Sequence, residues 1–100
     1  MTCGPLSLDP ATHVVTCRDE LVELSAREFA LLEFFLRHPN QVLARTTIIE
    51  HVWAHAYDGF SNVVDVYVRY LRDKIDRPYD LDLLQTVRGV GYRLACPPTP

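Results

Sequence analysis

The sequence lacks the features that mark membrane, secreted and disulfide-rich proteins. No apolar run approaches the roughly 20 residues that a helix needs to span a bilayer, and the N-terminus lacks the basic-then-apolar order of a secretory signal. Three cysteines, Cys3, Cys17 and Cys96, show no paired spacing. An odd count without a signal argues against a disulfide framework. We therefore expect a cytoplasmic protein with reduced thiols and no membrane partner.

The sequence also lacks the short motifs of common enzymes. His51 and His55 lie one helical turn apart, but Glu50 precedes them, whereas the zincin motif needs its glutamate directly after the first histidine. No glycine-rich phosphate loop follows an expected strand, and no serine or cysteine lies in a recognisable nucleophile signature. We expect no catalysis, no metal site and no cofactor.

Positive charge is scarce, since the chain has 10 Lys and Arg residues but 13 Asp and Glu residues, which gives a formal net charge of -3. This balance counts against nucleic-acid binding, because such domains are typically basic. The charges are unevenly placed, however. The last third holds Arg69, Arg72, Lys74, Arg77, Arg88 and Arg93, and the first third holds Asp9, Asp19, Glu20, Glu23, Glu28 and Glu33. Local potential governs phosphate contact, so DNA binding stays open.

What is present fits one globular domain over residues 1–100, with its core over about 6–94. Short β-like runs at 6–8, 13–17 and 21–24 predict a small antiparallel sheet. Ser25 and Glu28 then form a capping box, which predicts a helix that ends near His38-Pro39. Apolar spacing predicts a second helix over about 46–56.

A third helix begins after Ser61, a candidate N-cap, and closes at residues 77–79. Its apolar stripe consists of Val64, Val68, Leu71 and Ile75, and its opposite side carries Asn62, Val66, Arg69, Tyr70 and Asp73. That side mixes groups that suit the hydrogen-bonding edges and thymine methyls of a major groove. Asp65 precedes Arg69 by four residues, a spacing that predicts an ion pair. Residues 83–87 and 92–94 predict a hairpin whose turn glycines permit positive φ.

Sheet, three helices and hairpin together predict an α+β fold, a winged helix-turn-helix with an N-terminal antiparallel sheet and a C-terminal β-hairpin wing. Four segments in order, LSAREFALLEFFLRHP, VLARTTIIEHVW, NVVDVYVRYLRDKID and LLQTVRGVGYRL, resemble the effector domain of OmpR/PhoB-type response regulators. The resemblance covers roughly residues 6–94. It implies sequence-specific binding of double-stranded DNA and transcription regulation in a two-component phosphorelay.

The resemblance also implies which residues meet DNA. The third helix would enter the major groove and the wing the minor groove, while two residues flanking the second helix would meet phosphates. The implied DNA-binding residues are Arg45, Trp53, Asn62, Val63, Val66, Tyr67, Arg69, Tyr70, Arg72, Thr86, Arg88 and Tyr92. Trp53 also lies on the apolar stripe of its helix, so a core role stays open. Ala44 stands where the family commonly has a capping serine.

The partners implied are double-stranded DNA with tandem half-sites, a second copy on that DNA, and RNA polymerase. The polymerase contact would be the loop with Tyr57, Asp58, Gly59 and Phe60. Family members carry an upstream receiver domain, for which 100 residues leave no room, so we expect this chain to be a fragment. The alternative is a winged helix that binds only proteins, which the acidic balance and the tyrosines of the third helix keep open.

Overall fold

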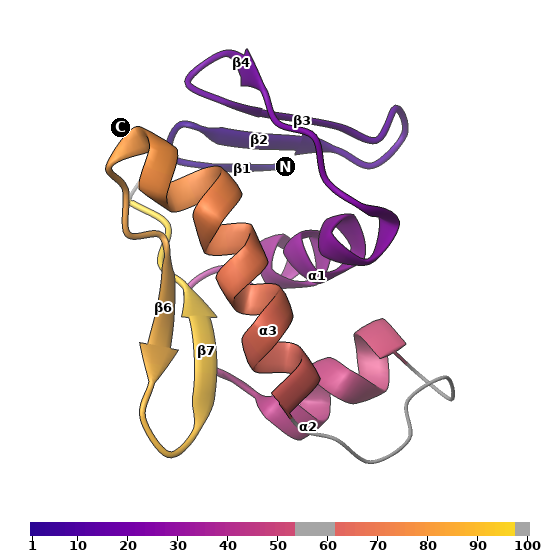
Figure 1. Cartoon of the computed structure of the whole chain (residues 1–100), viewed down its shortest axis with the longest axis vertical. Coiled ribbons are helices and arrows are strands. Elements are labelled where there is room, and N and C mark those ends of the chain that lie inside the picture. Colours follow the sequence, from indigo (N-terminus) through magenta and orange to yellow (C-terminus); the bar gives the residue numbers. More distant parts are fainter. Residues whose placement is uncertain (54–61, 98–100) are drawn as a thin grey trace.

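The computed structural model describes residues 1–53 and 62–97. It has the order of elements expected of a winged helix, with an N-terminal sheet, helices and a C-terminal hairpin. Figure 1 shows the N-terminal sheet at one end of the molecule. The turn of the C-terminal hairpin and the start of helix α3 lie together at the opposite end. Within the described ranges, no helix is long and apolar enough to cross a membrane.

The N-terminal sheet has four antiparallel strands in sequence order. They are β1 (Thr2–Cys3), β2 (Leu6–Asp9), β3 (Val14–Cys17) and β4 (Glu20–Leu21). Alternate residues of β2 and β3 turn inward, so Leu6, Leu8 and Val15 are buried. The sequence predicted the last three strands, although β4 ends three residues earlier than expected. It did not predict β1, which extends the core to Cys3.

Helix α1 (Ala26–Arg37) begins and ends where the sequence predicted. Ser25 and Glu28 form the reciprocal capping box: the Ser25 hydroxyl accepts from the Glu28 amide, and the Glu28 carboxylate accepts from the Ser25 amide. Lys74 Nζ also donates to Glu28 at 2.7 Å, although 46 residues separate them. Burial raises the pKa of Glu28, but the bonds from Lys74 and Ser25 outweigh it and leave the pKa below its ordinary value.

The helix-turn-helix consists of two segments, each of which begins as an α-helix and continues as a π-helix. Helix α2 (Arg45–Ile48) continues as η1 (Ile49–Trp53), and α3 (Asn62–Leu71) continues as η3 (Arg72–Asp76) before the 3-10 turn η4 (Arg77–Tyr79). Val64, Val68, Leu71 and Ile75 are at most 1% exposed, as their spacing predicted. The second helix begins one residue earlier than expected, and its expected end at residue 56 lies outside the described residues.

The hairpin of β6 (Leu84–Val87) and β7 (Gly91–Leu94), here called the wing, belongs to a three-stranded sheet in the order β5-β7-β6. Strand β5 (Leu43–Ala44), which the sequence did not predict, pairs with β7. Gly89 has the expected positive φ of 76°. Gly91 does not serve the turn through a positive φ; it lets β5 approach, since a Cβ there would lie 2.0 Å from the Leu43 carbonyl oxygen.

One expectation about the cysteines is wrong. Cys3 and Cys96 form a disulfide across a sequence separation of 93, and only Cys17 is free. Cys17, the last residue of β3, is fully buried, so its thiol is shielded. The disulfide joins β1 to the segment after the wing. The expectation failed because the fold brings the two ends of the domain together, which sequence spacing does not reveal.

Candidate nucleic-acid interface

The side of α3 that faces away from the core, here called the α3 outer face, consists of Asn62, Val66, Arg69, Tyr70 and Asp73. Asn62, Arg69, Tyr70 and Asp73 are exposed, and Val66 is half-buried. Val63 and Tyr67 are half-buried at its margin and pack on the core. The face therefore offers an amide, a guanidinium and apolar surface side by side, the mixture expected from the sequence.

The expected ion pair between Asp65 and Arg69 is not formed. Asp65 accepts instead from Arg45 Nε at 2.8 Å and from the Tyr92 hydroxyl. Partial burial raises the pKa of Asp65, but the Tyr92 and Arg45 hydrogen bonds more than offset it and the pKa is lowered. Among the described residues, Arg69 has no ion-pair partner. Its guanidinium is therefore available to a ligand.

Arg45, Asp65 and Tyr92 join three separate elements, since they lie on α2, α3 and β7. The Arg45 guanidinium also lies 5.1 Å from the centre of the Tyr92 ring, a cation–π distance. Tyr92 itself is 5% exposed. Tyr92 therefore lies beneath the candidate interface, because its ring is buried and its hydroxyl donates to Asp65. The three residues thus connect the two helices and the wing through side-chain contacts.

Arg72 makes a second connection between α3 and the wing. Its Nε donates to the Leu84 carbonyl at 2.8 Å and its Nη2 to the Thr86 hydroxyl at 2.7 Å. Its guanidinium lies 5.8 Å from the Tyr92 ring centre. Two of the five N–H donors of Arg72 thus hold the wing against the helix, while Thr86 remains exposed on β6.

The wing turn carries Arg88, which is exposed, next to Gly89 and the exposed Val90. In Figure 1 this turn lies at the end of the domain where α3 begins. Arg88 makes no ion pair within the described ranges. On the α3 outer face and the wing turn, Arg69 and Arg88 are therefore the two cations without an ion-pair partner in the described part of the chain.

Trp53, Tyr67 and Tyr70 form a chain of edge contacts, here called the aromatic cluster. Trp53 is 7% exposed and meets Tyr67 at 5.3 Å between ring centres, and Tyr67 meets Tyr70 at 5.4 Å, both near perpendicular. The Arg27 guanidinium lies 5.5 Å from the Trp53 ring. The core role that the sequence left open for Trp53 fits this burial. The sequence did not reveal the cluster, because no periodic signal links a residue of η1 to α3.

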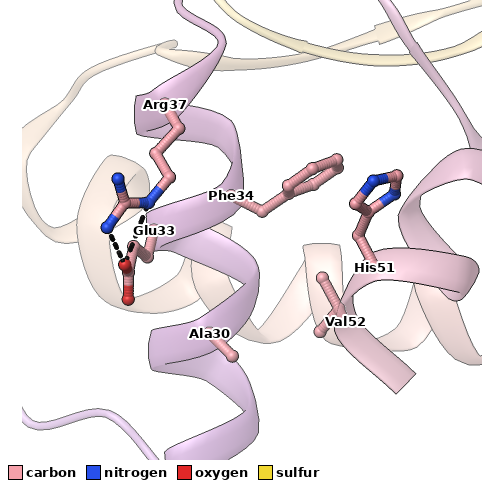
Figure 2. A pocket seen from close by; sticks show the side chains of 6 residues that line it. All are labelled: Ala30, Glu33, Phe34, Arg37, His51 and Val52. Carbon is pink, nitrogen blue, oxygen red and sulfur yellow. Dashed lines mark hydrogen bonds and ion pairs between the residues drawn. The ribbon is translucent and has the colours of Figure 1, made fainter. Parts of the chain in front are cut away.

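A pocket of about 250 Å³ opens between α1 and η1. Figure 2 shows Phe34 and His51 facing each other across this pocket, and their rings stack with 4.8 Å between the ring centres. The His51 ring nitrogen Nδ1 lies 2.9 Å from the Thr47 carbonyl, so this histidine is held as a structural group. The expected polymerase contact, Tyr57 to Phe60, lies outside the described residues.

Residues 19–94 match the family described as "Transcriptional regulatory protein, C terminal". The chain belongs to this family. Its function is that of response-regulator effector domains, DNA-binding transcription regulation, and the OmpR/PhoB resemblance is confirmed. The chain is 50% identical to transcriptional regulatory protein TcrA of Mycobacterium tuberculosis over 94 residues, 94% of this chain and 37% of TcrA. It is 46% identical to CusR of Escherichia coli over 92 residues, 92% of this chain and 40% of CusR.

Solved structures of effector domains share the fold as well. The DNA-binding domain of Klebsiella pneumoniae RstA, solved with the RstA box, has a TM-score of 0.84 at 31% identity and covers 95% of each chain. The AdeR DNA-binding domain, solved with an intercistronic region, has a TM-score of 0.83 at 31% identity, covering 93% of this chain and 96% of that one. The winged-helix fold is thereby confirmed. The chain spans well under half the length of the curated relatives named above.

Proposed function

We propose that this domain binds a specific double-stranded DNA sequence by placing the α3 outer face in the major groove and Arg88 in the adjacent minor groove. The observation that supports this most is the exposure of Arg69 and Arg88, which have no ion-pair partner among residues 1–53 and 62–97. They lie on two elements that the Arg45–Asp65–Tyr92 contacts connect. Preorganisation of this kind reduces the ordering cost of binding.

Individual contacts follow from the chemistry of each group. Asn62 pairs with adenine or donates to phosphate, Arg69 reaches guanine or the backbone, and Val66 packs on a thymine methyl. Thr86 and the free edge of Arg72 contact the backbone beside the wing. Val63, Tyr67 and Arg45 line the margins of the face, and the buried Trp53 and Tyr92 support it from beneath.

We further propose the setting in which the domain works. Two copies bind tandem half-sites about one helical turn apart, each inserting one α3. A receiver domain precedes this domain in the full-length protein, the loop over residues 57–60 contacts RNA polymerase, and the protein acts in the cytoplasm. The receiver domain is supported by the length of the relatives, of which this chain covers only 37% and 40%.

Selection of duplexes from a random pool, followed by affinity measurement against salt, tests the proposed function. We expect an enriched motif, and we expect its affinity to fall steeply with salt because each neutralised phosphate releases counterions. With few unpaired cations, the slope should be shallower than that of a strongly basic domain. No enrichment, together with no salt-dependent binding, would support the protein-binding alternative.

A further inference from the structure

The aromatic cluster places an unusual group on the α3 outer face. Tyr70 is 43% exposed, which makes it a large apolar side chain open to solvent in the middle of the candidate interface. It lies beside Arg69 and four residues after Val66, so all three share one face of the helix. An exposed ring at this position adds nothing to the hydrophobic core.

The cluster also restricts how Tyr70 can move. Its ring packs edge-on against Tyr67, and Tyr67 packs edge-on against Trp53, which is buried. Tyrosine has only two side-chain torsions before its hydroxyl, and these contacts fix them further. The ring therefore meets a ligand in a set orientation, at little entropic cost.

The chemistry of the major groove identifies what such a ring can read. Base edges there present hydrogen-bond donors and acceptors, and the thymine C5-methyl is the apolar group that distinguishes one base pair from the others. We infer that Tyr70 is a specificity-determining residue that packs on a thymine methyl, with Tyr67 as its positioning residue. This inference rests on the proposed function.

The spacing of Val66 and Tyr70 along α3 also predicts the spacing of the thymines that they contact. Val66 and Tyr70 are separated by four residues, about 6 Å along the helix axis, and successive bases of one strand rise about 3.4 Å. A helix that lies along the groove thus presents its two apolar groups to thymines about two base pairs apart, with Arg69 beside them. The preferred half-site should contain two methyl-sensitive positions at that spacing.

Uracil scanning of the selected duplex tests this directly. Each thymine is replaced in turn by deoxyuridine, which removes only the methyl, and the Kd is measured by fluorescence anisotropy. The wild-type domain should lose about fourfold in affinity at each of two positions. Tyr70→Ala should be insensitive to uracil at one of them and Val66→Ala at the other, while Tyr70→Phe should behave as wild type.

Tyr67 variants separate positioning from simple stability. Tyr67→Ala should reduce the effect of uracil at the Tyr70 position, and Tyr67→Phe, which keeps the ring, should restore it, with thermal unfolding confirming that every variant is folded. A uracil scan that is flat, or unchanged in Tyr70→Ala, would overturn the inference and leave the proposed function intact. Loss of affinity in Tyr70→Phe equal to that in Tyr70→Ala would assign a hydroxyl contact and also overturn it. Failure to select any duplex would overturn both.

Discussion

Several charged residues near the candidate interface are already engaged inside the molecule. Asp65 holds Arg45, and the wing holds Arg72 through two hydrogen bonds. These two guanidinium groups connect α2, α3 and the wing, and they leave less positive charge available for contact with phosphates. Specific recognition therefore depends on a small number of side chains, of which Arg88 is the simplest to isolate because it lies alone on a turn.

Arg88→Gln should weaken binding to the selected duplex about tenfold. An arginine side chain is attracted by the enhanced negative potential of a narrow minor groove, so the loss should be larger when the flanking sequence is an A-tract. Arg18→Gln removes the same charge from an exposed turn in the N-terminal sheet and should leave affinity unchanged. Equal effects of the two substitutions, measured by anisotropy at one salt concentration, would refute the role given to Arg88.

The sequence could predict residue roles only where they arise from local spacing. The apolar stripe of α3 and the capping box of α1 depend on residues three or four apart, and both are present in the structure. The same local reasoning paired Asp65 with Arg69 and was wrong. Arg45, 20 residues away, and Tyr92, 27 residues away, compete for that carboxylate, and only the tertiary fold brings them near.

Helix α2 begins without a side-chain cap. Ala44 occupies its N-cap position with extended backbone angles and no side-chain hydrogen bond to the helix. A serine there could accept from a free amide of the first turn. We expect Ala44→Ser to raise the free energy of unfolding by about 1 kcal/mol, measured by urea denaturation. Ala11→Ser, in an exposed turn, is the matched control, and an Ala44→Ser variant no more stable than wild type would show that α2 needs no cap.

The contact between α1 and η3 should make stability depend on pH. Because the folded-state pKa of Glu28 is lowered, its contribution is present above the unfolded-state pKa and is lost as pH falls through the folded-state value. Glu28→Gln should therefore be less stable than wild type at neutral pH, and the difference should shrink on acidification. Glu23→Gln, at an exposed site, should show no such convergence. A gap between wild type and Glu28→Gln that stays constant down to acid pH would contradict this assignment.

Two of the three two-residue strands, β1 and β5, escaped prediction for a physical reason. Strands β1 and β5 are too short to show alternation, and they exist because longer neighbours pair with them. Gly91 illustrates the same point, since its lack of a side chain serves the approach of β5 rather than the turn of the hairpin. Helices and the wing strands carry their own periodicity, and their boundaries were predicted to within a few residues wherever these fall in the described ranges.

For the molecule as one unit, the Cys3–Cys96 disulfide closes a loop that contains nearly the entire domain. Cross-links over loops of this length restrict the unfolded chain and can add about 4 kcal/mol to stability. Reduction should lower Tm by at least about 10 °C, and a Cys3→Ser/Cys96→Ser variant should not respond to reductant. When protein purified in air is unfolded without reductant, one of its three cysteines should react with a thiol reagent. Three reactive thiols would contradict the cross-link.

Recognition of a specific sequence by this domain requires that the α3 outer face meets the bases. The most direct test is the Kd of Val66→Asp for the selected duplex, with Val14→Asp, on the exposed side of the N-terminal sheet, as control. A carboxylate at position 66 would face the base edges and phosphates, so we expect Val66→Asp to lose at least about a hundredfold in affinity. Its circular dichroism should remain that of the folded domain, and Val14→Asp should bind normally. Wild-type affinity in a folded Val66→Asp domain would contradict the account.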